Sequence, residues 1–173
     1  MRGCARAAGR RLAWFVRPHV TPDRTQMQRA LKDVLVPRIR AMGFVGEFPH
    51  FRHRIGAEYQ MLMIGFNKYG GSFYLEAGRL SESHLLELQQ HWTKAGKNLA
   101  DSDLTVGHCS WKERARFGGD HVHPDADHWF KFGPDRLEPE TYREQPMSHY
   151  RAIASQVLSS LDRQASEFFN HAA

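Results

Sequence analysis

Long apolar runs are missing from the sequence: its purely apolar stretches are short, such as Met61–Ile64. A membrane-crossing helix needs about 20 consecutive, mostly apolar residues, so no membrane span is expected. Cysteine is also scarce, with Cys4 and Cys109 the only two among 173 residues. Two cysteines cannot build the disulfide framework typical of small secreted proteins. We therefore expect a reduced, cytoplasmic protein.

Motifs of the common enzyme classes are absent as well. The sequence has no Walker loop, no dinucleotide-binding glycine fingerprint, no Gly-x-Ser-x-Gly nucleophile elbow and no His-Glu-x-x-His zinc motif. It therefore predicts no cofactor. An uncommon enzyme is not excluded, so the question of catalysis stays open.

Acidic residues are scarce only at the start of the chain. Residues 1–24 hold six arginines and one acid, Asp23, whereas the rest holds 18 basic and 18 acidic residues. The net charge of +5 thus belongs to the extension. Residues 25–173 are neutral overall and so lack the basic surface of a nucleic-acid-binding domain. A nucleic-acid partner is therefore not expected. Binding of nucleic acid through the Arg-rich segment is the weakest alternative.

The same segment does not match a targeting signal. Its apolar stretch Leu12–Val16 is shorter than the roughly 7–15 residues of a secretory signal core. Its arginines are typical of organelle transit peptides, yet it contains no serine. We predict a flexible extension over residues 1–24 and one domain over residues 25–173.

Helical periodicity marks both ends of that domain. Thr21, Pro22 and Asp23 form a helix-start signal, and Gly43 is a natural stop. Ser148 can cap the last helix. The apolar positions repeat at helical spacing at Met27, Ala30, Leu31, Val34, Leu35, Ile39 and Met42 in the first helix, and at Tyr150, Ile153, Ala154, Val157, Leu158, Leu161, Ala165 and Phe168 in the last.

Between these helices the apolar period changes to two, which indicates strands. Strands are predicted over 51–55, 59–66 and 72–80, then a helix over 84–99 and a bent strand over 104–117. Residues 59–66 are apolar on both faces, so this strand should be central and covered on each side. Short turns require antiparallel pairing. The prediction is an α+β fold, with an antiparallel sheet flanked by N-terminal and C-terminal helices.

Several segments together resemble a known family. They are Leu35-Val-Pro37, Met42-Gly-Phe44, Met63-Ile-Gly-Phe-Asn-Lys-Tyr69, Phe73-Tyr-Leu-Glu-Ala-Gly78, His108-Cys109 with Arg114 and Arg116, and Asp127-His-Trp-Phe130. Over roughly residues 27–132 the chain resembles the bacterial domain-of-unknown-function family 4304. The resemblance implies a small α+β fold and assigns no reaction, cofactor or partner.

An aromatic–arginine group is the first candidate site. Its members are Trp111, Arg114, Arg116 and Trp129. Arginine binds carboxylates and phosphates in a planar, bidentate manner, and Trp and Arg are common anchors of protein interfaces. The alternative is that the tryptophans lie in the core and the arginines in solvent.

A histidine-rich loop is the second candidate site. His121, His123, Asp125 and His128 carry metal-ligand atoms, and His108 could join them from a neighbouring strand. The alternative is a polar surface loop without metal. A Cys109–His108 dyad is not expected, because adjacent strand residues point to opposite faces. Cys109 is predicted to be a small core residue.

The preferred interpretation is a non-enzymatic binding or interaction domain for an unknown protein or small-molecule partner. It would act through the face near Trp111, Arg116 and Trp129. The alternative is a metal-dependent enzyme that uses loop 121–128.

Overall fold

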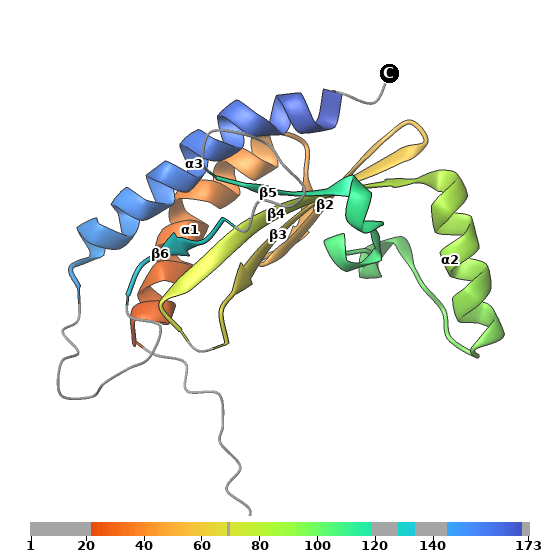
Figure 1. Cartoon of the computed structure of the whole chain (residues 1–173), viewed down its shortest axis with the longest axis horizontal. Helices are drawn as coiled ribbons and strands as arrows, with labels where there is room; N and C mark the ends of the chain where they lie inside the picture. The colour runs from red at the N-terminus through yellow and green to blue at the C-terminus, as the bar shows by residue number, and fades with distance from the viewer. Residues whose placement is uncertain (1–21, 69, 119–127, 134–144, 171–173) are drawn as a thin grey trace, which may run out of the picture.

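A meander of antiparallel strands forms the centre of the computed structural model, which describes residues 22–68, 70–118, 128–133 and 145–170 (Figure 1). The elements follow in the order α1 (Pro22–Ala41), β1 (Val45–Glu47), β2 (His50–Ile55), β3 (Glu58–Phe66), β4 (Ser72–Ser81), α2 (Glu82–Lys94), three short 3-10 helices, β5 (Arg114–Phe117), β6 (Phe130–Lys131) and α3 (Met147–Asn170).

The sheet has the order β1-β2-β3-β4-β5, and β6 pairs with the start of β4. Every pairing is antiparallel, as short connections require. The predicted α+β class, with helices at both ends of the domain, is thus confirmed. None of the described helices is long and apolar enough to cross a membrane.

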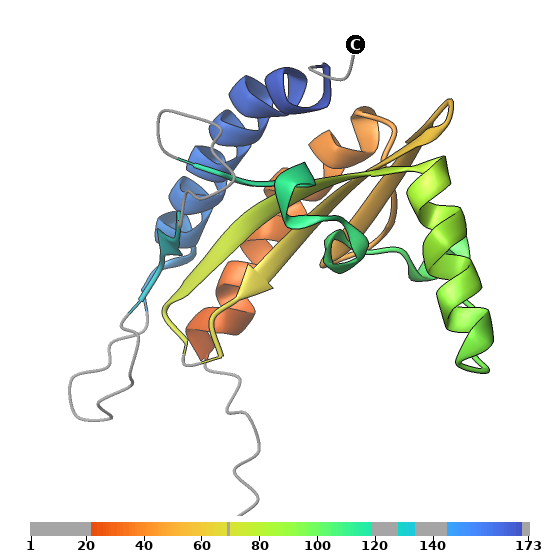
Figure 2. The same cartoon turned by 45° about the vertical axis from the view of Figure 1, so that its right-hand side comes forward.

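Helices α1 and α3 cover the same face of the sheet (Figures 1 and 2). They run in the same direction, as contacts at both ends show. Tyr150 near the start of α3 donates a hydrogen bond to Asp23 near the start of α1. Near their ends, Arg38 and Asp162 form a 2.6 Å salt bridge. Their apolar stripes bury β-strand side chains such as Leu62 in the main core.

The opposite face is covered at one end by α2 and by the 3-10 helices Asp101–Asp103 and Val106–His108. Strand β3 supplies both cores, because Met61 and Leu62 point to opposite faces and are 0% and 1% exposed. This confirms that β3 is central and covered on both sides. Figure 2 shows α2 on the far side of the sheet from α3.

Two sequence predictions need correction. The strand expected over 104–117 is largely a run of 3-10 turns, and only Arg114–Phe117 pairs with β4. The second helix ends at Lys94 rather than near residue 99, because Gly96 has a φ of +70°, which favours glycine and ends a helix. Helix α1 begins at Pro22, which confirms the helix-start signal at Thr21, Pro22 and Asp23.

Candidate binding site

Arg116 on β5 lies against two aromatic rings on the sheet face opposite α1 and α3. Its Cζ is 4.1 Å from the Tyr74 ring centroid and 5.3 Å from that of Trp129. The two rings meet edge to face, with centroids 5.0 Å apart and an interplanar angle of 85°. Both distances from Arg116 are within the range of cation–π attraction, about 6 Å. The guanidinium therefore sits in a corner made by the two rings.

Strand register explains this meeting. Residues Phe73, Leu75 and Ala77 of β4 point into the main core, so Tyr74 and Glu76 point to the other face. Glu76 pairs directly with Arg116 across the β4–β5 ladder. We call the four residues Tyr74, Glu76, Arg116 and Trp129 the Arg116 cluster. All four are partly exposed.

Gly65 on β3 makes room for Tyr74. The two residues are direct partners in the β3–β4 ladder, and a Cβ added to Gly65 would overlap the Tyr74 ring. The hydroxyl end of the ring therefore lies over Gly65, in the space that a side chain would fill. A larger residue at position 65 would push Tyr74 away from Arg116.

Partial burial perturbs the acidic groups of the cluster. Burial raises the pKa of Glu76, and the nearby charges of Arg116 and Arg114 oppose that rise. Burial also raises the pKa of the Tyr74 hydroxyl, reinforced by the charge of Glu76. At neutral pH Tyr74 is thus a neutral hydrogen-bonding group beside a cation.

The structure separates Arg114 from the predicted site. Its Nε donates to the Cys109 carbonyl at 2.9 Å, and its Nη2 donates to the Gly107 carbonyl at 2.8 Å. Five N–H donors in a fixed fork suit this task. Arg114 thus holds residues 107–109 against β5 and has a structural role.

Trp111 is also apart from the Arg116 cluster. It lies in the 3-10 helix Trp111–Glu113, before β5, and is 65% exposed. Its ring pairs with Lys112, whose Nζ is 5.6 Å from the ring centroid. The sequence group therefore splits, and only Arg116 and Trp129 come together.

The predicted metal ligands are only partly within the described residues. His121, His123 and Asp125 lie outside them. His108 Nδ1 accepts from the Thr105 backbone N–H at 3.1 Å, and His128 packs on Phe130 with centroids 4.8 Å apart. No group of three or more His, Cys, Asp or Glu side chains suited to a metal occurs in the described part of the chain. The metal site in loop 121–128 therefore stays the alternative to the metal-free loop that we predict.

Cys109 is a core residue. It is 4% exposed, and a Cβ added to Gly78 would come within 2.6 Å of its Sγ. Burial raises the pKa of its thiol to about 12, which suppresses the nucleophilic thiolate. The reason given for excluding a dyad was wrong in detail, since His108 and Cys109 lie at a 3-10 turn rather than in a strand.

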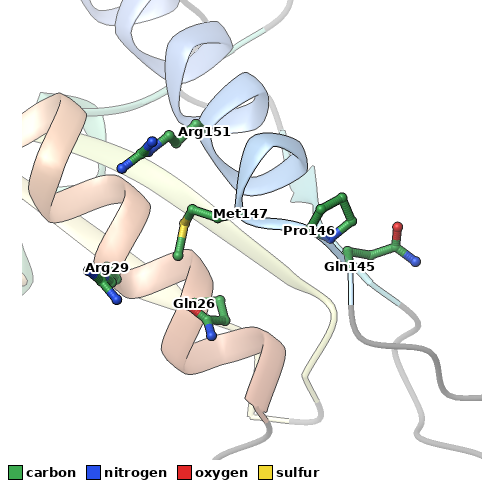
Figure 3. A pocket seen from close by; sticks show the side chains of 6 residues that line it. All are labelled: Gln26, Arg29, Gln145, Pro146, Met147 and Arg151. Atoms are coloured by element: carbon green, nitrogen blue, oxygen red, sulfur yellow. The ribbon is translucent and has the colours of Figure 1, made fainter.

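A hollow of about 650 Å³ lies between the starts of α1 and α3 (Figure 3). Gln26 and Arg29 line it from α1, and Met147 and Arg151 from α3. Arg151 is 3.9 Å from Asp33, so its charge is partly offset. None of the sequence-predicted site residues lines this hollow.

Sequence reasoning missed Tyr74 and Glu76. The predicted strand 72–80 contained both, and their alternation with Phe73, Leu75 and Ala77 was the available signal. Their meeting with Arg116 depends on the register between β4 and β5, which is set by a connection of over thirty residues and cannot be read from the pattern.

Comparison with protein-family models found no match, and searches of curated proteins and of solved structures found none either. The resemblance to family 4304 therefore stays a prediction.

Proposed function

We propose that this chain is a non-catalytic, cytoplasmic binding domain that engages a protein partner through the Arg116 cluster. The observation that supports this is the position of Arg116 in the corner between Tyr74 and Trp129. Trp, Tyr and Arg are the residue types that contribute most to binding at protein interfaces. Here all three adjoin one another and are partly exposed.

The chemistry of the cluster indicates what the partner presents. Aromatic contacts hold the guanidinium before binding, which reduces the entropy lost when the complex forms. An arginine positioned in this way binds a carboxylate through two parallel hydrogen bonds. We infer that the partner places an Asp or Glu side chain at Arg116 and an apolar group at Trp129.

The resemblance adds a proposal about ancestry. On the segments quoted above, we propose that the chain is bacterial and belongs with family 4304. Membership would assign no reaction, so the binding proposal depends on the Arg116 cluster alone.

The test is quantitative affinity capture from lysate of the cells that make the protein. Wild type is compared with Arg116→Gln and Trp129→Ala, and Trp111→Ala is the matched control because Trp111 is more exposed but lies apart. Thermal melts of all variants confirm folding. A specific partner should be retained by wild type and by the control, and reduced about tenfold or more by the other two.

Two results would contradict the proposal. Equal retention by wild type and Arg116→Gln would show that the cluster is not the interface. Loss of the partner with Trp111→Ala alone would place the interface on the 3-10 segment instead.

A further inference from the structure

A pocket of about 450 Å³ lies beside the end of β3, away from the Arg116 cluster's arginine and tryptophan. Strand β2 begins at His50, which pairs with Met63, so β3 runs past it for the three residues 64–66. The first half of α1 forms one wall, and the turn at Phe48 and Pro49 forms another. The volume is within the range of small-molecule sites, about 300–1,000 Å³.

Cations from α1 line this pocket. Arg24, Gln28 and Lys32 are spaced four residues apart, so they share one face of the helix. The Arg24 Cζ is 4.9 Å from the Phe66 ring centroid, and the Lys32 Nζ is 5.2 Å from that of Phe48. These contacts hold both charges at the pocket wall.

None of the described residues that line this pocket carries a carboxylate. The acids of α1 that flank its cations face α3 instead. Asp23 accepts a hydrogen bond from the Tyr150 hydroxyl, and Asp33 lies 3.9 Å from Arg151. Neither acid thus lies at the pocket, where the exposed Lys32 side chain supplies an ammonium group.

Hydrogen-bonding groups also face this space. His50 lines the pocket, and burial lowers the pKa of its imidazole, so the ring is a neutral hydrogen-bonding group there. On β3, the Ile64 N–H donates to the Pro49 carbonyl at 3.1 Å. Strand alternation directs the Phe66 N–H to the same side, toward the pocket.

We propose that this pocket binds a small organic anion, with its carboxylate or phosphate group at Arg24, Lys32 and His50. The apolar body of the ligand would pack against the rings of Phe48 and Phe66. Both anionic groups accept charge-assisted hydrogen bonds from the same donors. This inference does not depend on the proposed protein partner, because neither Arg116 nor Trp129 lines the pocket.

The experiment uses two probes, phenyl phosphate and 3-phenylpropionate, with 3-phenylpropan-1-ol as the uncharged comparison. Each is titrated into full-length, ¹⁵N-labelled protein, and backbone amide shifts are followed by NMR. We expect saturable binding of at least one anion in the millimolar range or tighter, with shifts at Gln28 and Ile64–Phe66. The anion that binds more tightly identifies the ligand class as phosphate or carboxylate.

Variants assign the binding to the pocket. Lys32→Gln should weaken binding of the preferred anion about tenfold, because it removes a charged partner. Lys97→Gln is the matched control, since Lys97 also lies over an aromatic ring, with Nζ 5.8 Å from the centroid of Trp92. It should leave affinity unchanged. Arg24→Gln, checked by a thermal melt, is the second pocket variant.

Three results would overturn the proposal. One is the absence of saturable shifts with either anion. Another is equal binding of the alcohol, which would mean that charge does not matter. The last is binding outside the pocket, shown by unchanged affinity in both Lys32→Gln and Arg24→Gln or by shifts confined to other parts of the chain.

Discussion

Replacement of Ile64 by alanine tests the position of β3 between two packed layers. Ile64 is 2% exposed and belongs to the main core beneath α1 and α3. The change removes three buried carbon atoms, worth about 0.8 kcal/mol each, or about 2.4 kcal/mol together. A residual cavity adds to this, so the expected loss of unfolding free energy is about 3–4 kcal/mol.

Arg52→Ala is the matched control in the neighbouring strand. Arg52 pairs with Met61 on β3 and with Val45 on the outermost strand β1, and its side chain is only partly buried. Its loss should cost under about 1 kcal/mol. Urea unfolding followed by circular dichroism measures both variants, with the midpoints compared at a constant slope.

Thermal melts provide a second measure. For a domain of this size, 1 kcal/mol corresponds to roughly 2–4 °C. Ile64→Ala should therefore lower the Tm by about 6–16 °C, and Arg52→Ala by no more than a few degrees. Equal losses in the two variants would refute the assignment of Ile64 to the packed core beneath α1 and α3.

Three further predictions concern side chains away from the Arg116 cluster. In a Cys4→Ser background, Cys109 should resist thiol reagents at pH 8 while the protein is folded, and rapid labelling of folded protein would contradict this. The free energy of unfolding should fall as pH rises from about 9 to about 12, because the thiol ionises at lower pH in the unfolded chain than in the folded protein. Arg79→Met should raise the free energy of unfolding in urea by about 1–2 kcal/mol. Nε and Nη1 of Arg79 are buried without hydrogen-bond partners among the described residues, and its side chain packs on Phe168. A loss of stability would show that the guanidinium is paired. Protein prepared without a histidine tag should contain no stoichiometric metal at loop 121–128 by elemental analysis, and one zinc per chain with a chelator-induced drop in Tm would reverse that prediction.

Local patterns were enough to predict the two long helices and the three central strands. The helix stripe from Met27 to Ile39 and the alternation in 73–77 both reflect a single buried face. The apolar character of both faces of 59–66 also predicted the two cores. Each of these signals depends on a residue and its near neighbours, which the sequence contains in full.

The segment 104–117 shows where local patterns fail. Leu104, Val106 and Cys109 are buried, and apolar residues at such short intervals suggest a strand. They bury their side chains from successive 3-10 turns, with hydrogen bonds such as Cys109 N–H to the Val106 carbonyl at 3.0 Å. The turns are accommodated because Gly78 leaves space for Cys109 on β4, a long-range contact that spacing alone does not show.

The anion pocket was missed for a related reason. The polar stripe of Arg24, Gln28 and Lys32 was visible at helical spacing, yet a solvated helix face has the same pattern. What distinguishes it is the end of β3 opposite, which is left beside the helix because β2 starts at His50. That offset is a property of strand register, which one sequence does not contain.

Two glycines divide the second face of the sheet into halves with different roles. Gly78 on β4 admits Cys109, so the half near α2 closes into an apolar core. Gly65 on β3 instead admits the ring of Tyr74, which contacts the Arg116 guanidinium. Because β4 alternates, Tyr74 and Glu76 can change without removing a side chain from the main core beneath. The same strand thus provides a packing layer on one face and a partly exposed aromatic and charged surface on the other.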